Sequence, residues 1–109
     1  MNIKDNLVRH YLWLRQYGLN DSHSGNASVR DGVSFWITPT GCCADLLSSG
    51  DLVECQTDGV LGKGAPLDAR LHLAVYQSNP QTSAVLHSHG PYSVAMTMDN
   101  EEFLPADFE

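Results

Sequence analysis

Two histidines, His87 and His89, lie one residue apart in the apolar segment VLHSHG, which begins at Val85. The segment is typical of a β-strand, in which residues i and i+2 point to the same face. Imidazole nitrogens bind zinc at about 2.0–2.1 Å, so two rings on one face can share one ion. Both histidines could instead be hydrogen-bonded within a partly buried sheet. We favour a metal role for the pair.

A catalytic ion needs more than two ligands, and a segment upstream offers further candidates. A helix is predicted over LDARLHLAVYQS (67–78), where Asp68 and His72 lie four residues apart and therefore on one face. Asp68 could be a ligand, a general base, or a charge that stabilises the first turn of the helix. His72 lies among leucines and an alanine, which favours a packed histidine behind the site over a ligand.

Two polar loops could bind an anion. HSGN (23–26) and TPTG (38–41) combine small residues with hydroxyl or amide groups, and their backbone N–H groups could cradle a phosphate. The same residue types are what ordinary turns need. The loops alone therefore favour turns over a binding site.

The remaining pattern predicts one α/β domain with a largely antiparallel sheet. Helical spacing of apolar residues predicts a first helix over about 3–17, and Asp-Gly at 31–32 predicts a tight turn between two strands. Pro91 opens a second apolar segment, PYSVAMTM, that we interpret as a helix. Strands are predicted near 27–30, 34–38, 52–56 and 83–89, and a loop or short helix near 44–47.

Composition excludes several classes of function. The 109 residues carry 6 Lys and Arg against 13 Asp and Glu, a net charge of −7, without a basic stripe. This argues against nucleic acid and anionic membranes as partners. No apolar run approaches the roughly 20 residues that span a bilayer. The three cysteines are odd in number and two are adjacent, so a reducing, cytoplasmic location is expected.

Taken in order, several of these segments resemble the class II aldolase/adducin family. They are GNASVR, ITPTG, DLVE with a following Asp-Gly, the helix with an acid four residues before a histidine, and AVLHSHGPY. The resemblance runs from about residue 7 to the C-terminus. It implies an α/β/α sandwich with a mostly antiparallel central sheet. Family domains are roughly twice as long, so the single domain 1–109 is expected to be incomplete at its C-terminus.

The resemblance also implies a chemistry. Family enzymes use a divalent ion, usually zinc, that stabilises the enediolate formed from a small ketose or sugar phosphate. By this resemblance His87 and His89 are two of three histidine ligands and Asp68 is the catalytic base. The phosphate would bind at Gly25, Asn26, Thr40 and Gly41. Family enzymes are homo-oligomers, commonly tetramers.

The chain departs from the family pattern in ways that leave alternatives open. The usual acid is glutamate, and Asp68 is one methylene shorter; His23 stands where a threonine is usual, and APLD is one residue short. The third histidine would come from His72, from a partner chain or from a longer protein. An epimerase or decarboxylase, a non-catalytic adducin-like interaction module and an inactive fragment remain alternatives to an aldolase. We expect little activity from the 109 residues alone.

Overall fold

The computed structural model describes residues 2–18, 25–89, 93–98 and 103–107, and from residue 88 onward it describes the backbone only. Two α-helices, two short 3₁₀ turns and six strands make up these ranges. They are α1 (Ile3–Gln16), β1 (Asn26–Asp31), β2 (Ser34–Ile37), η1 (Ala44–Leu46), η2 (Ser49–Asp51), β3 (Val53–Gln56), α2 (Ala69–Ser78), β4 (Ala84–His89), β5 (Ser93–Met98) and β6 (Phe103–Asp107).

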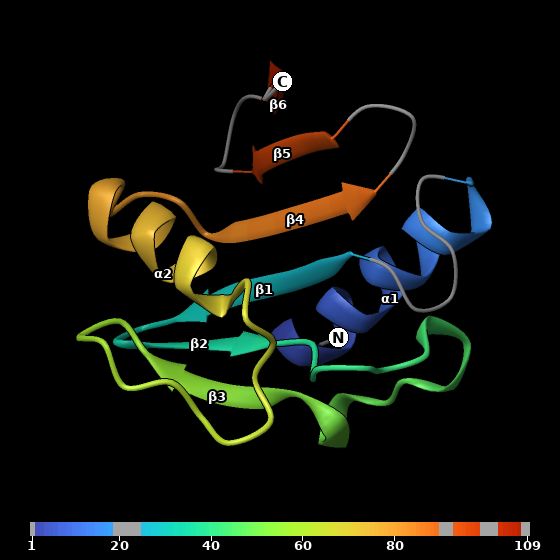
Figure 1. Ribbon diagram of the computed structural model, residues 1–109, viewed down its shortest axis with the longest axis horizontal. Coiled ribbons are helices and arrows are strands. Elements are labelled where there is room, and N and C mark those ends of the chain that lie inside the picture. Colours follow the sequence, from blue (N-terminus) through green and yellow to red (C-terminus); the bar gives the residue numbers. More distant parts are fainter. Residues whose placement is uncertain (1, 19–24, 90–92, 99–102, 108–109) are drawn as a thin grey trace.

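The strands form one sheet in the order β3-β2-β1-β4-β5-β6. All neighbouring strands are antiparallel, so the predicted antiparallel character of the sheet is confirmed. The register of the central pair places Asn26 opposite His87 and Ser28 opposite Val85. Figure 1 shows β1 and β4 side by side in the middle of the molecule. Two segments nearly sixty residues apart in the sequence therefore meet at the centre of the sheet.

The two helices cover opposite faces of the sheet (Figure 1). In β1, Ala27 and Val29 belong to the apolar cluster of α1, whereas Ser28 faces α2. In β4, Leu86 packs with α1 and Val85 with α2. This alternation is what the two-residue period of a strand dictates. The predicted α/β/α sandwich is confirmed.

The first helix begins and ends where its sequence predicts. The Asn2 side chain accepts a hydrogen bond from the backbone N–H of Asp5 at 2.8 Å and so caps the N-terminus. Leu7, Tyr11 and Leu14 form its buried face. Beyond the last turn Gly18 has a φ of +77°, a conformation that glycine adopts without strain.

One predicted element is wrong. The segment from Ser93 to Met98 is strand β5, paired antiparallel with β4 from Ala84↔Met98 to His89↔Ser93. A short apolar run has no decisive period, and pairing with β4 satisfies backbone groups that would otherwise lie along an open sheet edge. Residues 91 and 92, where the helix is predicted to start, lie outside the described residues.

Within the described ranges, neither helix has the length and apolar character needed to cross a membrane.

Candidate active site

A polar row on β1 faces a polar row on α2. Side chains two residues apart on a strand are separated by about 6.6 Å, and those four apart on a helix by about 6 Å, so the two rows stay in step. Successive members are joined by hydrogen bonds across the interface. The rows consist of Asn26, Ser28 and Arg30 in β1, and of Asp68 just before α2 with His72 and Tyr76 within it.

Asp68 occupies the N-cap position of α2, but its side chain makes no capping hydrogen bond. Instead its Oδ2 accepts a hydrogen bond from Asn26 Nδ2 at 2.9 Å and lies 3.3 Å from His87 Nδ1. The carboxylate is thus turned from the helix toward the sheet. A purely helix-stabilising role for Asp68 does not account for these contacts.

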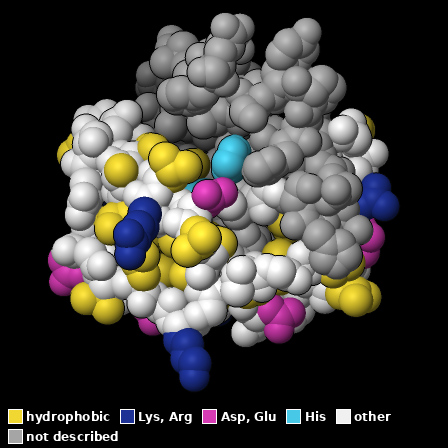
Figure 2. All heavy atoms as spheres, in the orientation of Figure 1, with side chains coloured by type: hydrophobic (Ala, Val, Ile, Leu, Met, Phe, Trp, Pro, Cys, Tyr) yellow, Lys and Arg dark blue, Asp and Glu magenta, His cyan; other side chains and the backbone are white. Residues whose placement is uncertain are grey.

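His87, in β4, lies beside Asp68. Its side chain is 20% exposed and that of Asp68 is 37% exposed, so the pair lies at the surface but is partly screened from water. Figure 2 shows a histidine and an acidic side chain adjacent on this face, with hydrophobic side chains nearby. His89 is the last residue of β4, and its side chain lies outside the described part of the chain.

His72 is buried behind this pair, with only 1% of its surface exposed. Its Nδ1 lies 2.6 Å from Ser28 Oγ, and its Nε2 contacts Asn26 Oδ1. Burial, with a smaller contribution from His87, lowers the pKa of His72 to about 4, against an opposing effect of Asp68. The ring is therefore neutral near pH 7. Because both nitrogens are engaged, the alternative in which His72 supplies a third metal ligand does not fit this geometry.

Ser28 and Tyr76 are site residues that the sequence reasoning missed. Ser28 Oγ also lies 2.7 Å from the Tyr76 hydroxyl, and both side chains are buried. Burial raises the pKa of Tyr76, although the hydrogen bond with Ser28 and the charge of Arg30 oppose the shift. The signal is present in the sequence. The polar residues at every second position of NASVR have nearly the same spacing along β1 as residues 68, 72 and 76 have along the helix.

The first predicted phosphate loop ends beside the start of the second. His23 and Ser24 of the first loop lie outside the described residues. The backbone of Ala27 pairs with Thr38, whose N–H donates to Ala27 O at 3.0 Å, so TPTG begins beside Asn26. Gly25 O accepts a hydrogen bond from the Tyr11 hydroxyl at 3.2 Å, and the N–H of Thr40 donates to Gly64 O at 2.8 Å. Thr40 and Gly41 are exposed, whereas Asn26 is buried with its carboxamide directed at Asp68 and His72.

The donor types at the site suit a divalent transition metal. An imidazole and a carboxylate in contact are common zinc ligands. Among the side chains that the structure describes, no group of three or more His, Cys, Asp and Glu residues is arranged to hold an ion. Asp68 and His87, 3.3 Å apart, are two such donors in contact. The chemistry of these two side chains suits a divalent ion, and a complete site needs at least one further ligand.

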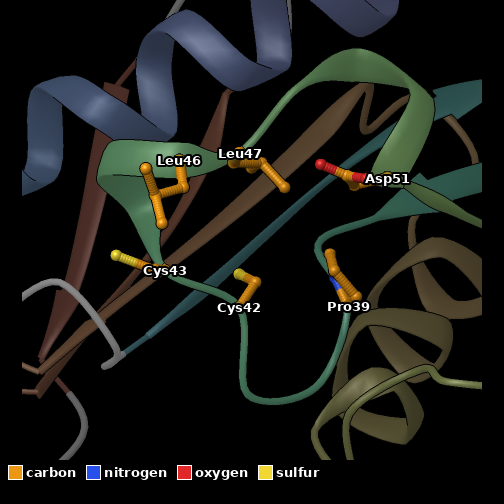
Figure 3. A pocket seen from close by; sticks show the side chains of 6 residues that line it. All are labelled: Pro39, Cys42, Cys43, Leu46, Leu47 and Asp51. Atoms are coloured by element: carbon orange, nitrogen blue, oxygen red, sulfur yellow. The ribbon is translucent and has the colours of Figure 1, made fainter.

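A pocket of about 390 Å³ lies elsewhere, between Pro39 and the 3₁₀ turns. Figure 3 shows its lining side chains, which come from the chain between β2 and β3. The pocket contains neither Asp68 nor His87, so its size does not make it the candidate site. It is lined by Pro39, Cys42, Cys43, Leu46, Leu47 and Asp51.

Comparison with known sequences finds a matching protein family and similar individual proteins. The family described as Class II Aldolase and Adducin N-terminal domain matches residues 5–109. An L-fuculose phosphate aldolase of Methanococcus maripaludis (strain C7) is 34% identical over 91 residues, which cover 83% of this chain and 49% of the relative. The L-fuculose phosphate aldolase of Escherichia coli (strain K12) is 35% identical over 97 residues, covering 87% and 45%.

Solved structures agree. An L-fuculose 1-phosphate aldolase superposes with a TM-score of 0.73 at 28% identity, covering 83% of this chain and 45% of the other. The L-fuculose-1-phosphate aldolase of Thermus thermophilus gives 0.72 at 28% identity, with 82% and 48% covered. The chain spans about half the length of the curated relatives it matches. It belongs to the class II aldolase and adducin family.

Proposed function

We propose that this chain carries the N-terminal part of the active site of a metal-dependent aldolase-type lyase that acts on a small ketose or sugar phosphate. The observation that carries the proposal is the contact between Asp68 Oδ2 and His87 Nδ1 at 3.3 Å. It joins an acid at the start of a helix to a histidine of the central sheet. The similarity to L-fuculose phosphate aldolases supports the class of substrate.

The metal would be zinc or another divalent transition ion, held by His87 and His89. When bound, it would act as a Lewis acid that polarises the substrate's carbonyl and hydroxyl oxygens. The chain supplies two histidines toward a site that usually has three protein ligands. We propose that the remaining ligand comes from a longer protein or from a neighbouring subunit of a homo-oligomer, such as a tetramer.

Asp68 would act as the general base. As a carboxylate it accepts a proton from a substrate hydroxyl or carbon, and its 37% exposure leaves it accessible to a small molecule. The hydrogen bond from Asn26 Nδ2 holds the carboxylate in place. Because Asp68 is one methylene shorter than the usual glutamate, its reach depends on this placement.

The substrate's phosphate would bind where the first polar loop ends and the second begins. Gly25 and Asn26 lead into β1 beside the site, and Thr40 and Gly41 lie exposed in the neighbouring turn. The carboxamide of Asn26 is already bonded to Asp68 and His72. We therefore assign the anion contacts mainly to backbone and hydroxyl groups of these loops. A cytoplasmic location suits such an enzyme.

The test begins with the metal content per chain after zinc reconstitution and gel filtration. In a protein that includes the rest of the site, we expect about one zinc per chain that is lost in the double variant His87→Ala/His89→Ala. His10→Ala, on α1 and far along the chain from the site, is the matched control and should keep the zinc. Full zinc stoichiometry in the double variant would refute the assignment of the ligands.

A second arm separates ligand from base. Asp68→Asn should keep zinc and lose aldol cleavage of a ketose 1-phosphate, measured in a protein that includes the rest of the site. Equal loss of zinc and cleavage would make Asp68 a ligand first. Zinc binding without any cleavage in the unmodified protein would favour the adducin-like interaction module, and proton exchange without cleavage would favour an epimerase.

A further inference from the structure

We propose that His72 is a positioning residue: its Nε2–H holds the Asn26 carboxamide so that the amino group of Asn26 faces Asp68. Its importance for catalysis rests on the proposed role of Asp68 as base. The order of the hydrogen bonds does not depend on that role. It follows from the contacts of the described side chains.

The order can be worked out from Asp68. A carboxylate only accepts hydrogen bonds, so Asn26 must direct its amino group toward Asp68 Oδ2, 2.9 Å away. The other end of the carboxamide, Oδ1, then faces His72 Nε2 and can only accept. His72 must therefore carry its proton on Nε2. A carboxylate at the surface thus selects the tautomer of a buried ring.

The order continues inward. With its proton on Nε2, a neutral His72 has a lone pair on Nδ1, which accepts from the Ser28 hydroxyl at 2.6 Å. Ser28 has then used its proton, so the Tyr76 hydroxyl donates to Ser28 Oγ at 2.7 Å. All four contacts are satisfied by this one arrangement. Every donor points along the same direction, from Tyr76 through Ser28, His72 and Asn26 to Asp68.

Burial enforces this arrangement of hydrogen bonds. Asn26, Ser28, His72 and Tyr76 are all buried, so water does not replace a misdirected partner. The opposite tautomer of His72 would place two acceptors, Nε2 and Asn26 Oδ1, against each other. Relief would require Asn26 to turn its carboxamide, which would direct an acceptor at the Asp68 carboxylate. The neutral Nε2–H form of His72 therefore fixes the donor that Asp68 receives.

The end of the row away from Asp68 is anchored to the backbone. The Arg30 guanidinium donates to Tyr76 O at 2.6 Å and to Pro80 O at 2.9 Å. These bonds tie the C-terminal end of α2 to β1. Tyr76, Ser28 and His72 are consequently held by both elements, and none of them needs to touch a substrate to influence Asp68.

The first experiment reads the tautomer directly. In the ¹⁵N-labelled chain at pH 7, the two ring nitrogens of His72 should give the shifts of a protonated Nε2 and an unprotonated Nδ1. A ring protonated on Nδ1, or on both nitrogens, would overturn the proposal. The measurement requires neither metal nor substrate, so its outcome is separate from that of the zinc and cleavage tests.

Variants test where the order originates. Asp68→Asn can both donate and accept, so the single tautomer of His72 should become a mixture; an unchanged spectrum would show that Asp68 does not set the order. His72→Gln retains a donor toward Asn26, whereas His72→Leu does not. The Asn26 side-chain amide protons should stay protected from exchange with water in the glutamine variant and lose protection in the leucine variant.

Equal protection in both His72 variants would refute the positioning role. If His72→Leu fails to fold, the tautomer in wild type and in Asp68→Asn decides the question, because Asp68 is half-buried at the surface and its replacement leaves the core intact.

Discussion

Ser28 Oγ in the centre of the sheet lies 2.6 Å from Nδ1 of His72 in the helix that covers it. This hydrogen bond is buried on all sides and joins residues 44 positions apart. It lies behind the surface pair of Asp68 and His87. The site is therefore supported by a polar layer inside the interface between β1 and α2, where an apolar core would be usual.

Removing the Tyr76 hydroxyl should destabilise the fold moderately. In Tyr76→Phe the ring still packs against Phe35, but Ser28 loses a buried partner. We expect a decrease of about 1–2 kcal/mol in the free energy of unfolding, measured by urea denaturation. Tyr17→Phe is the control, because Tyr17 is 76% exposed, and it should be neutral. Equal effects of the two changes would contradict the buried contact.

Acid should destabilise the chain through His72. Its pKa is lowered from 6.5 to about 4 in the folded state, chiefly by burial, so the unfolded state binds more protons between these values. The contribution of His72 to the free energy of unfolding is fully present above about pH 6.5. It is lost as the pH decreases toward 4, by about 3 kcal/mol in total.

Urea midpoints at pH 7 and pH 5 check this pH dependence. His10→Gln should keep it, because His10 lies on α1, and His72→Gln should reduce it. A pH dependence unchanged in His72→Gln would mean that other groups cause it.

Gly62 should not tolerate a side chain. A Cβ at this position would collide with the backbone oxygen of Glu54 and lie 2.6 Å from Val53 Cγ1. Both partners belong to β3, so the strand would have to shift. Gly62→Ala should lower the free energy of unfolding by about 1–3 kcal/mol. Gly50→Ala, where a Cβ meets nothing within 4 Å, should change it little. Thermal melts of the two variants decide between these outcomes.

Thiol labelling should separate the cysteines. Burial raises the pKa of Cys55, which also accepts a hydrogen bond from the N–H of Gly62 at 3.3 Å. Cys42 and Cys43 are only partly buried. Mass spectrometry after brief treatment with a maleimide at pH 7 should find Cys43 modified and Cys55 unmodified until denaturant is added. Early modification of Cys55 would show that the face beneath α2 opens readily.

The sequence predicts those features that depend on periodicity. The apolar spacing of residues 7, 11 and 14 predicts α1, and the turn at 31–32 predicts the hairpin of β1 and β2. The meeting of Asp68 with His87 follows from the pattern only once a family fold is assumed. The roles of the two residues, of His89 and of the phosphate loops remain predictions.

Other features depend on contacts that the sequence does not specify. The Asn26 carboxamide bonds Asp68 and His72 because β1 and α2 pack in one register, which the loop HSGN does not reveal. In the sequence Ser28 looks like an ordinary strand residue, because its contacts also depend on how β1 and α2 pack. The helix predicted over residues 91–98 is wrong from Ser93 to Met98, because a short segment with few polar positions fits either a helix or a strand.

The alternation of β1 has a consequence for how this domain tolerates mutation. Its two faces differ by a single step along the strand: Ala27 and Val29 pack under α1, and Asn26 and Ser28 face α2. Adding or deleting one residue would exchange the faces, burying polar groups under α1 and setting methyl groups against His72. Point substitutions can remove the site while the domain survives. A change in the length of β1 would disturb both faces at once. The length of β1 is therefore constrained by the core and by the site together.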